Sequence, residues 1–104
     1  MKRKFLATAA IVLLLFMSRM AMGEGPSAEW GKKLFNDPAL GGSANSSSCS
    51  SCHPGGRGLE GSGDNPSLKN MINTCIVKAL AGTGLEEGSE ELASLQLYIQ
   101  SLGE

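Results

Sequence analysis

The stretch Cys49-Ser-Ser-Cys52-His53 decides how this sequence is interpreted. It sets two thiols three positions apart and places an imidazole directly after the second. On either side, residues 37–51 and 54–65 are rich in Gly, Ser, Asn and Pro, so both segments are predicted to be loops. Two loops around one short motif would not fold by themselves, and we expect a bound group to order them.

Cys-x-x-Cys-His is the sequence to which c-type haem is attached. Two thiols at this spacing reach the two vinyl groups of one porphyrin, and the next residue places an imidazole under the iron. A thioredoxin-like redox site would need a βαβ pattern, which the sequence lacks. A disulfide between Cys49 and Cys52 would close only a tiny loop. Zinc bound by these three side chains together with Cys75 is the fourth interpretation, but the adjacent Cys52 and His53 do not converge easily on one tetrahedral ion. The motif and its context favour haem c, one group bound covalently.

Length and charge limit the classes of function. The 104 residues allow one small domain, and a core of that size rarely stabilises a fold without a disulfide, a metal or a cofactor. Four of the nine basic residues lie in the first nineteen positions, so the rest of the chain is acidic, with five basic and ten acidic residues. An acidic domain with one Trp and one Tyr is a poor candidate for binding nucleic acid, because it repels phosphate and offers few rings on which bases stack.

The N-terminal segment has the composition of a secretory signal peptide. A basic start is followed by the apolar run Phe5–Met17, which is shorter than the roughly 20 residues that span a bilayer. Small residues then follow at Ala21 and Gly23, with the spacing of a cleavage site. We therefore predict a signal peptide over residues 1–23 and an exported, periplasmic domain over residues 24–104, with no stable membrane insertion after cleavage. A retained N-terminal anchor helix is the alternative.

Three segments have the apolar spacing of amphipathic helices, which predicts an all-α fold. Their predicted limits are residues 27–36, Pro66 to Gly82, and Ser89 to Gly103. Ser27 and Ser89 are typical N-terminal caps, and Gly82 is a typical stop. The predicted buried stripes are Leu68, Met71, Ile72, Cys75, Ile76, Ala79 and Leu80 in the second helix, and Leu92, Leu95, Tyr98 or Ile99, and Leu102 in the third.

With these helices in place, the chain resembles a monohaem class I cytochrome c over the whole of residues 24–104. Gly31 and Phe35 stand where that family's N-terminal helix carries a glycine and an aromatic residue. Leu95 and Tyr98 stand where its C-terminal helix carries their partners. The resemblance implies a small all-α domain wrapped round one covalently bound haem. It also implies that the two helices cross closely at Gly31, with Phe35 against Tyr98.

The stretch Gly63-Asp-Asn-Pro66-Ser-Leu68 is similar to the Gly-Pro-x-Leu segment that follows the haem motif in this family. By this resemblance, the Pro66 carbonyl accepts a hydrogen bond from Nδ1 of His53 and orients the ring as the proximal iron ligand. Pro66 is also a typical first residue of a helix. Arg57 is a candidate partner for a haem propionate, and a solvated loop charge is the plain alternative.

The sixth iron ligand departs from the common pattern of the family. His53 is the only histidine, and no methionine follows Met71, whereas common members place a methionine ligand nearer the last helix. The sulfur candidates are Met71 and Cys75, four residues apart on one helix face. Residues 73–82, followed by residues 89–98, resemble the His/Cys-ligated haem domains of thiosulfate dehydrogenases and of the sulfur-oxidising cytochrome complex. This resemblance implies Cys75 as the distal ligand. Met71 is the alternative, and an open or water-bound site is the third possibility.

These features predict a periplasmic electron carrier that cycles between Fe(III) and Fe(II) and docks with redox partner proteins. Nothing in the sequence forms a catalytic acid–base pair, and there is one haem motif, so an enzyme is not expected. Two other functions stay open. The chain is alternatively the haem subunit of an enzyme that oxidises sulfur compounds, or a haem-based sensor of small ligands. Composition does not predict the oligomeric state.

Overall fold

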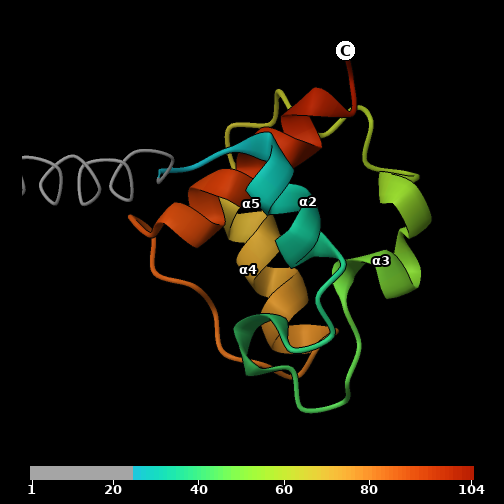
Figure 1. The fold of residues 1–104 in the computed structure, drawn as a ribbon, viewed down its shortest axis with the longest axis vertical. Helices are drawn as coiled ribbons and strands as arrows, with labels where there is room; N and C mark the ends of the chain where they lie inside the picture. The colour runs from blue at the N-terminus through green and yellow to red at the C-terminus, as the bar shows by residue number, and fades with distance from the viewer. Residues whose placement is uncertain (1–24) are drawn as a thin grey trace, which may run out of the picture.

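The computed structural model describes residues 25–104, and the predicted signal peptide lies outside these residues. The described part contains helices and no β-strand, so the all-α prediction is confirmed. Over residues 25–104, four α-helices and two short 3-10 turns follow one another (Figure 1). In order they are α2 (Ala28–Phe35), η1 (Leu40–Gly42), α3 (Cys49–Cys52), η2 (Pro54–Gly56), α4 (Leu68–Lys78) and α5 (Glu90–Ser101).

The two helices near the ends of the domain begin where the sequence predicts. The Ser27 side chain accepts a hydrogen bond from the Trp30 N–H at 3.0 Å, and the Ser89 side chain accepts one from the Leu92 N–H at 3.2 Å. Each serine satisfies one of the N–H groups that the first turn of a helix leaves unpaired. The N-terminal limits of α2 and α5 are therefore confirmed. Helix α5 ends at Ser101, two residues before the predicted Gly103.

Helices α2 and α5 cross at Gly31 and form the most closely packed part of the molecule. A Cβ atom at Gly31 would overlap the backbone carbonyl of Ser94 and lie 2.8 Å from Cβ of Tyr98, so only glycine permits this approach. One turn later the rings of Phe35 and Tyr98 meet edge to face, with centroids 5.1 Å apart and planes at 63°. The close crossing and the aromatic pair predicted for these helices are both present.

Helix α4 packs beside α5 and uses only half of its predicted apolar stripe for the core. Leu68, Ile72 and Ile76 are buried, and Leu80 just beyond the helix is buried with them. The other members of the stripe, Met71, Cys75 and Ala79, are exposed. The apolar stripe of α4 is therefore wider than the part that packs into the core. Its exposed edge lines the pocket described below.

The end of α4 differs from its prediction. The helix stops at Lys78 rather than at Gly82, and Ala81, not the glycine, takes the left-handed conformation, with φ of 54°. Gly82 instead allows the backbone of Gly41 to approach closely, because a Cβ at position 82 would lie 2.6 Å from the carbonyl oxygen of Gly41. At the other end the helix begins after Ser67, so Pro66 precedes the helix and is not its first residue.

Residues 37–51 were predicted to be loop throughout, and this was wrong at two places. The 3-10 turn η1 buries Leu40 in the core, and the single helical turn α3 contains both cysteines of the motif. Neither element has an apolar repeat long enough to be recognised, because each is only three or four residues long. Within residues 25–104, no helix is long and apolar enough to cross a membrane.

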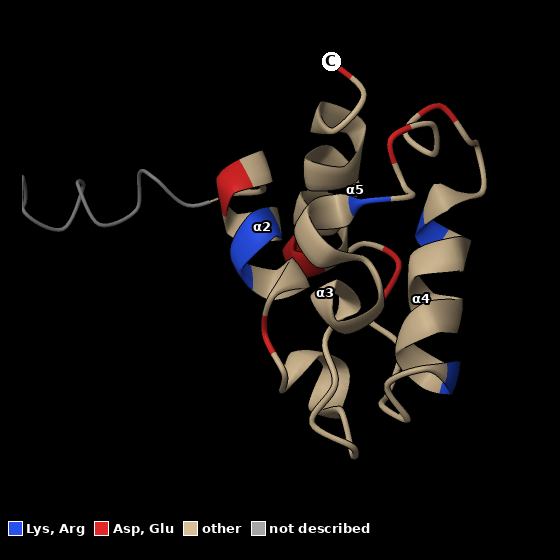
Figure 2. Cartoon of the chain, turned by 90° about the vertical axis from the view of Figure 1, so that its right-hand side faces the viewer, with Lys and Arg blue, Asp and Glu red and all other residues tan. Residues whose placement is uncertain are grey.

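Figure 2 shows where the charged residues lie on this framework. Helix α4 carries a lysine near each end, Lys69 and Lys78, and α2 carries Lys32 and Lys33. Acidic residues lie mainly in the loops and in the first turns of α2 and α5.

Candidate functional site

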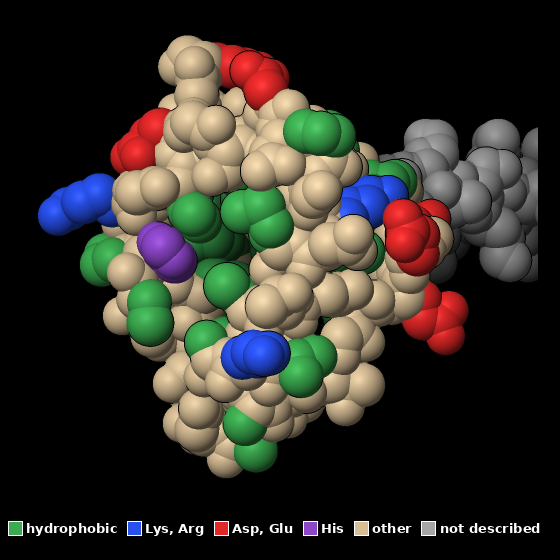
Figure 3. Space-filling view, turned by 180° about the vertical axis from the view of Figure 1, so that it is seen from behind, with side chains coloured by type: hydrophobic (Ala, Val, Ile, Leu, Met, Phe, Trp, Pro, Cys, Tyr) green, Lys and Arg blue, Asp and Glu red, His purple; other side chains and the backbone are tan. Residues whose placement is uncertain are grey.

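A pocket opens between the motif segment and helices α4 and α5. Its cavity volume is about 200 Å³, and its mouth is open to solvent. Its walls are almost wholly apolar and include Phe35, Leu68, Ile72, Leu80, Leu95 and Ile99. Three cysteines, one methionine and the histidine are also part of the lining, namely Cys49, Cys52, Cys75, Met71 and His53. Figure 3 shows the His53 side chain beside a group of hydrophobic side chains on this face of the molecule.

The turn α3 sets Cys49 and Cys52 on the pocket wall. The Ser48 N–H donates to Oγ of Ser51 at 2.9 Å, and the Ser51 N–H donates to the carbonyl of Ser48 at 3.0 Å. These bonds close one helical turn without any apolar contribution. Residues three apart on a helical turn are neighbours on one face, so both thiols are directed to the same side. The serine pair that flanks the cysteines is the signal that sequence analysis missed.

The Cys49 thiol is held in its neutral form. Burial, with smaller contributions from the neighbouring Cys75 and Cys52, raises its pKa from an ordinary 9.0 to about 11, although a backbone hydrogen bond acts in the opposite direction. A redox-active Cys-x-x-Cys site needs the opposite, a thiol whose pKa is lowered so that the thiolate can attack. The three cysteines are free thiols in this structure. The site therefore lacks the property that a thiol–disulfide exchange site requires.

His53 follows the turn directly, and its ring is oriented by a backbone group. Nδ1 lies 3.1 Å from the carbonyl oxygen of Arg57. A carbonyl can only accept, so Nδ1 carries the proton and Nε2 is left with a free lone pair. This is the tautomer that binds a metal through Nε2, and the carbonyl supplies the orienting partner that such ligands usually have.

The partner of His53 is thus Arg57 and not the predicted Pro66. Pro66 is exposed and does not line the pocket. The local reason is the tight turn η2, in which Gly55 and Gly56 have positive φ and bring the chain back over the ring. Gly58 also has positive φ, and a Cβ there would lie 3.5 Å from Nδ1 of His53. The run of glycines after the motif is the signal that could have revealed this turn.

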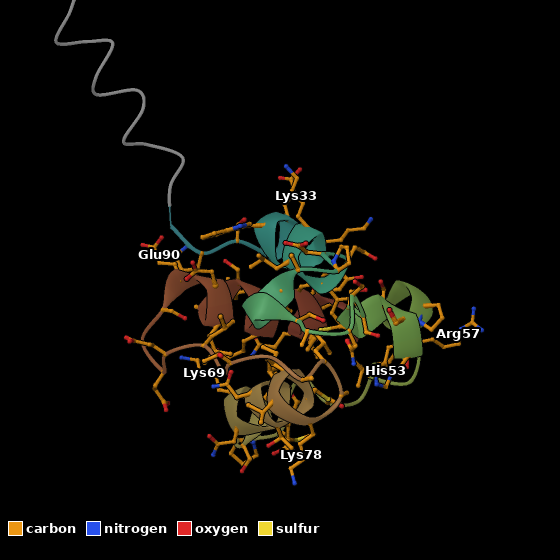
Figure 4. The ribbon with its side chains drawn as sticks, turned by 90° about the horizontal axis from the view of Figure 1, so that it is seen from below. Lys33, His53, Arg57, Lys69, Lys78 and Glu90 are labelled. Carbon is orange, nitrogen blue, oxygen red and sulfur yellow. The ribbon has the colours of Figure 1, made fainter. Side chains whose placement is uncertain are left out.

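The Arg57 side chain takes no part in the pocket. It is exposed, it is absent from the pocket lining, and it points away from the body of the molecule (Figure 4). The backbone carbonyl of Arg57 contributes to the site by its contact with His53. The sequence had instead predicted a role for the Arg57 guanidinium. The Lys78 side chain, at the end of α4, also points outward.

Both predicted sulfur ligands stand on the pocket-facing edge of α4. Met71 and Cys75 line the pocket opposite the motif segment, and both are exposed at its mouth. They differ in what they contact. The Met71 Sδ accepts a hydrogen bond from the Asn65 side-chain amide at 3.2 Å, which holds this sulfur towards the loop before α4. The Cys75 side chain is a free, exposed thiol.

The segment between α4 and α5 contributes Ala79 and Leu80, directly after the end of α4, to the pocket lining. It is fastened to the other side of α4 by Asn73, whose side-chain amide donates to the Leu85 carbonyl at 2.8 Å and accepts from the Leu85 N–H at 2.8 Å. Thr83 is also tied back, because its N–H donates to the carbonyl of Gly41 at 2.7 Å. The side of the pocket opposite His53 is therefore formed by α4 and the two residues directly after it.

The zinc interpretation does not fit this geometry. Among residues 25–104, no three His, Cys, Asp or Glu side chains are grouped closely enough to hold a metal ion between them. What the arrangement can do is present two thiols and one imidazole to a single large apolar group in the pocket, with a further sulfur on the opposite wall.

Comparison with protein-family models, with curated proteins and with solved structures gives no match for this chain. Its function is therefore argued from the site.

Proposed function

We propose that this chain is a periplasmic monohaem c-type cytochrome that carries single electrons between redox partner proteins. One observation carries the proposal: Cys49, Cys52 and His53 line the same apolar pocket. The three residues that the motif requires come together on a surface otherwise suited to a porphyrin. The class I cytochrome c fold is part of the same proposal, and the all-α architecture with its Gly31 crossing supports it.

The residues present fit a haem in chemistry as well as in position. Thioether formation needs thiols with access to the ligand, and both motif cysteines meet this need, since Cys49 is half-buried and Cys52 is exposed. The apolar lining excludes water from the faces of a macrocycle. When bound, the haem supplies an iron that accepts and releases one electron.

The protein's own contribution lies in the axial ligands. His53 offers Nε2, because its Nδ1–H is bonded to the Arg57 carbonyl. A hydrogen-bonded imidazole is a stronger donor, so this contact tunes the reduction potential as well as orienting the ring. On the other side Cys75 is the preferred ligand and Met71 the alternative. A thiolate would lower the reduction potential, and a thioether would raise it.

The test is covalent haem attachment. The full chain is expressed in a cell that matures c-type haem, and the exported product is analysed by intact mass. We expect the mass of the processed chain plus one haem, and an alkaline pyridine spectrum typical of two thioether bonds. Cys49→Ala and Cys52→Ala should each leave a haem with one thioether or lose it. A wild-type product with three free thiols and no haem would refute the proposal.

Cys75 supplies a matched control, since it is a third thiol in the same pocket. Cys75→Ala should keep both thioether bonds and change only the axial ligation. The low-temperature electron paramagnetic resonance spectrum of the ferric protein reports this directly. A low-spin thiolate signal that disappears in Cys75→Ala assigns the ligand to Cys75, whereas a His/Met signal unchanged by the substitution assigns it to Met71.

A second function is favoured by the position of Cys75. Its thiol is exposed at the pocket mouth and would also be accessible to a substrate. This arrangement suits the haem subunit of an enzyme that oxidises sulfur compounds. Thiosulfate would then reduce the haem of the wild-type protein, and Cys75→Ala would abolish this reduction. A pure electron carrier would show no reduction by thiosulfate alone.

A further inference from the structure

The loop that leads into the motif is fastened to the end of α4 at one junction. The Ala44 N–H donates to the Leu80 carbonyl at 3.0 Å, and the Gly41 carbonyl accepts from the Thr83 N–H at 2.7 Å. These two backbone bonds join residues far apart in the sequence. One partner of each bond lies in the loop before Cys49, and the other lies in the segment directly after α4.

Among the residues that the structure describes, Asn45 is the one whose side chain bridges this junction by hydrogen bonds. Its Nδ2 donates to the carbonyl of Ala79 at 3.0 Å. Its Oδ1 accepts from the Ser47 N–H and from the Ser43 hydroxyl, both at 3.0 Å. One amide thus orders the loop just before α3 and also holds the last turn of α4.

The bond to Ala79 acts on the turn that contains Cys75. Ala79 is the C-terminal cap of α4, and its own N–H donates to the Cys75 carbonyl at 2.8 Å. The last carbonyls of a helix have no partner within the helix, so an outside donor fixes where that turn lies. The chain of bonds runs from the loop before Cys49, through Asn45 and Ala79, to the backbone of Cys75.

We infer that Asn45 is a positioning residue that sets the separation between the haem-attachment turn α3 and the sulfur ligand on α4. This inference rests on the proposed function, because it assigns Asn45 a role in holding the distal ligand at the iron. Without the Asn45–Ala79 bond the end of α4 is freer to move outward, and the distal sulfur is more easily displaced by an added ligand.

The experiment measures cyanide binding to the ferric, haem-loaded protein. Asn45→Asp keeps the size of the side chain and the acceptor for Ser43 and Ser47, but it loses the donor to Ala79. Loss of one such bond should tighten cyanide binding by about tenfold. The electron paramagnetic resonance spectrum should show a smaller fraction of the wild-type low-spin species. Asn45→Ala, which removes all three bonds, should show the same change or a larger one.

A matched control separates positioning from general stability. The Asn36 amide donates to the Lys32 carbonyl at 2.8 Å, which is the same kind of bond at the end of α2, away from the junction. Asn36→Asp should change cyanide affinity by less than about twofold, because a bond confined to α2 does not hold the distal ligand. Equal cyanide affinities for wild type, Asn45→Asp and Asn36→Asp would overturn the inference. A matching increase in Asn36→Asp would overturn it too.

A second measurement needs no variant. Coupling between two sites is reciprocal, so displacing the distal ligand should loosen the junction. Saturating cyanide should accelerate hydrogen exchange at the Ala44 and Thr83 amides of the wild-type protein by about tenfold, whereas unchanged exchange would refute the inference. Intact mass distinguishes failure of the proposed function from failure of the inference about Asn45. A wild-type chain without haem refutes the proposed function and this inference together, and a haem-loaded chain with an unaltered junction refutes the inference alone.

Discussion

The crossing of α2 and α5 and the wall of the pocket differ in how closely their residues pack. At the crossing, Gly31 removes the last obstacle between two backbones, and Ser94 is fully buried with its Oγ accepting from the Ser27 N–H at 3.0 Å. At the pocket, Met71 is 41% exposed and Cys75 is exposed, although both continue an apolar stripe. The first region is completed by its own side chains, whereas the second leaves apolar side chains uncovered.

This contrast predicts which region would gain stability from a bound ligand. The crossing should form in the haem-free chain, because all of its partners lie within residues 27–98. The pocket wall should gain most from haem, since a bound group covers apolar surface that is otherwise in water. Three predictions test this division, in order of decreasing effect.

The largest effect is expected from Gly31→Ala. The new methyl group would overlap the Ser94 carbonyl, which is backbone and cannot turn aside, so α2 and α5 must separate. We expect the free energy of unfolding to fall by about 3 kcal/mol or more, measured by chemical denaturation followed by circular dichroism. Gly61→Ala is the control, because nothing lies within 4 Å of a Cβ at that position. Equal effects of the two substitutions would contradict the close crossing.

The next effect concerns pH in the haem-free chain. Folding raises the pKa of Cys49 from 9.0 to about 11, so the folded state keeps a proton that the unfolded state has lost between these values. The contribution of Cys49 should therefore be constant below pH 9 and fall by about 2 kcal/mol on going to pH 11. Comparison with Cys49→Ser isolates this residue from other groups that titrate in the same range. In the haem-loaded protein the thioether cannot ionise, and the difference should vanish. A persisting difference there would count against the assignment.

The smallest effect is predicted for Asn73→Asp. The substitution keeps the acceptor for the Leu85 N–H but sets a carboxylate against the Leu85 carbonyl, in a partly buried position. We expect a loss of about 1 kcal/mol in the free energy of unfolding, and faster hydrogen exchange at the Leu85 amide. Asn70→Asp is the control, since Asn70 is exposed on the same helix. If Asn70→Asp has the same effect on the Leu85 amide, charge on α4 rather than the lost bond is responsible.

The sequence predicts the parts of the fold that rest on repeated side-chain patterns. Helices α2, α4 and α5 follow from apolar spacing, with serine caps for α2 and α5, whereas the contact of Phe35 with Tyr98 was predicted through the family resemblance. The turn α3 could not be predicted in this way, because it is a single turn that Ser48 and Ser51 close without an apolar repeat. Periodicity also assigned one stripe of α4 wholly to the core, since a core-facing and a ligand-facing apolar edge have the same composition.

The site shows a different limit of prediction. Cys49, Cys52 and His53 were predicted as site residues from their type and spacing, whereas the preference for Cys75 came from the resemblance; all four line the pocket. The partner of His53 was not, because any residue supplies a backbone carbonyl and its identity carries no signal. Pro66 was expected through resemblance, whereas the geometry of η2 delivers the carbonyl of Arg57. Such partners are fixed by the path of the chain and not by side-chain chemistry.

The contact between His53 and a backbone carbonyl has a consequence for how this protein tolerates genetic change. A side-chain partner can be lost through one missense mutation, but the carbonyl of residue 57 survives almost any replacement of the arginine. The contact is instead sensitive to substitution of the glycines whose positive φ shapes the turn, namely Gly55, Gly56 and Gly58. Replacement of Arg57 should therefore leave the contact to Nδ1 of His53 intact, whereas replacement of a neighbouring glycine should misalign the His53 imidazole.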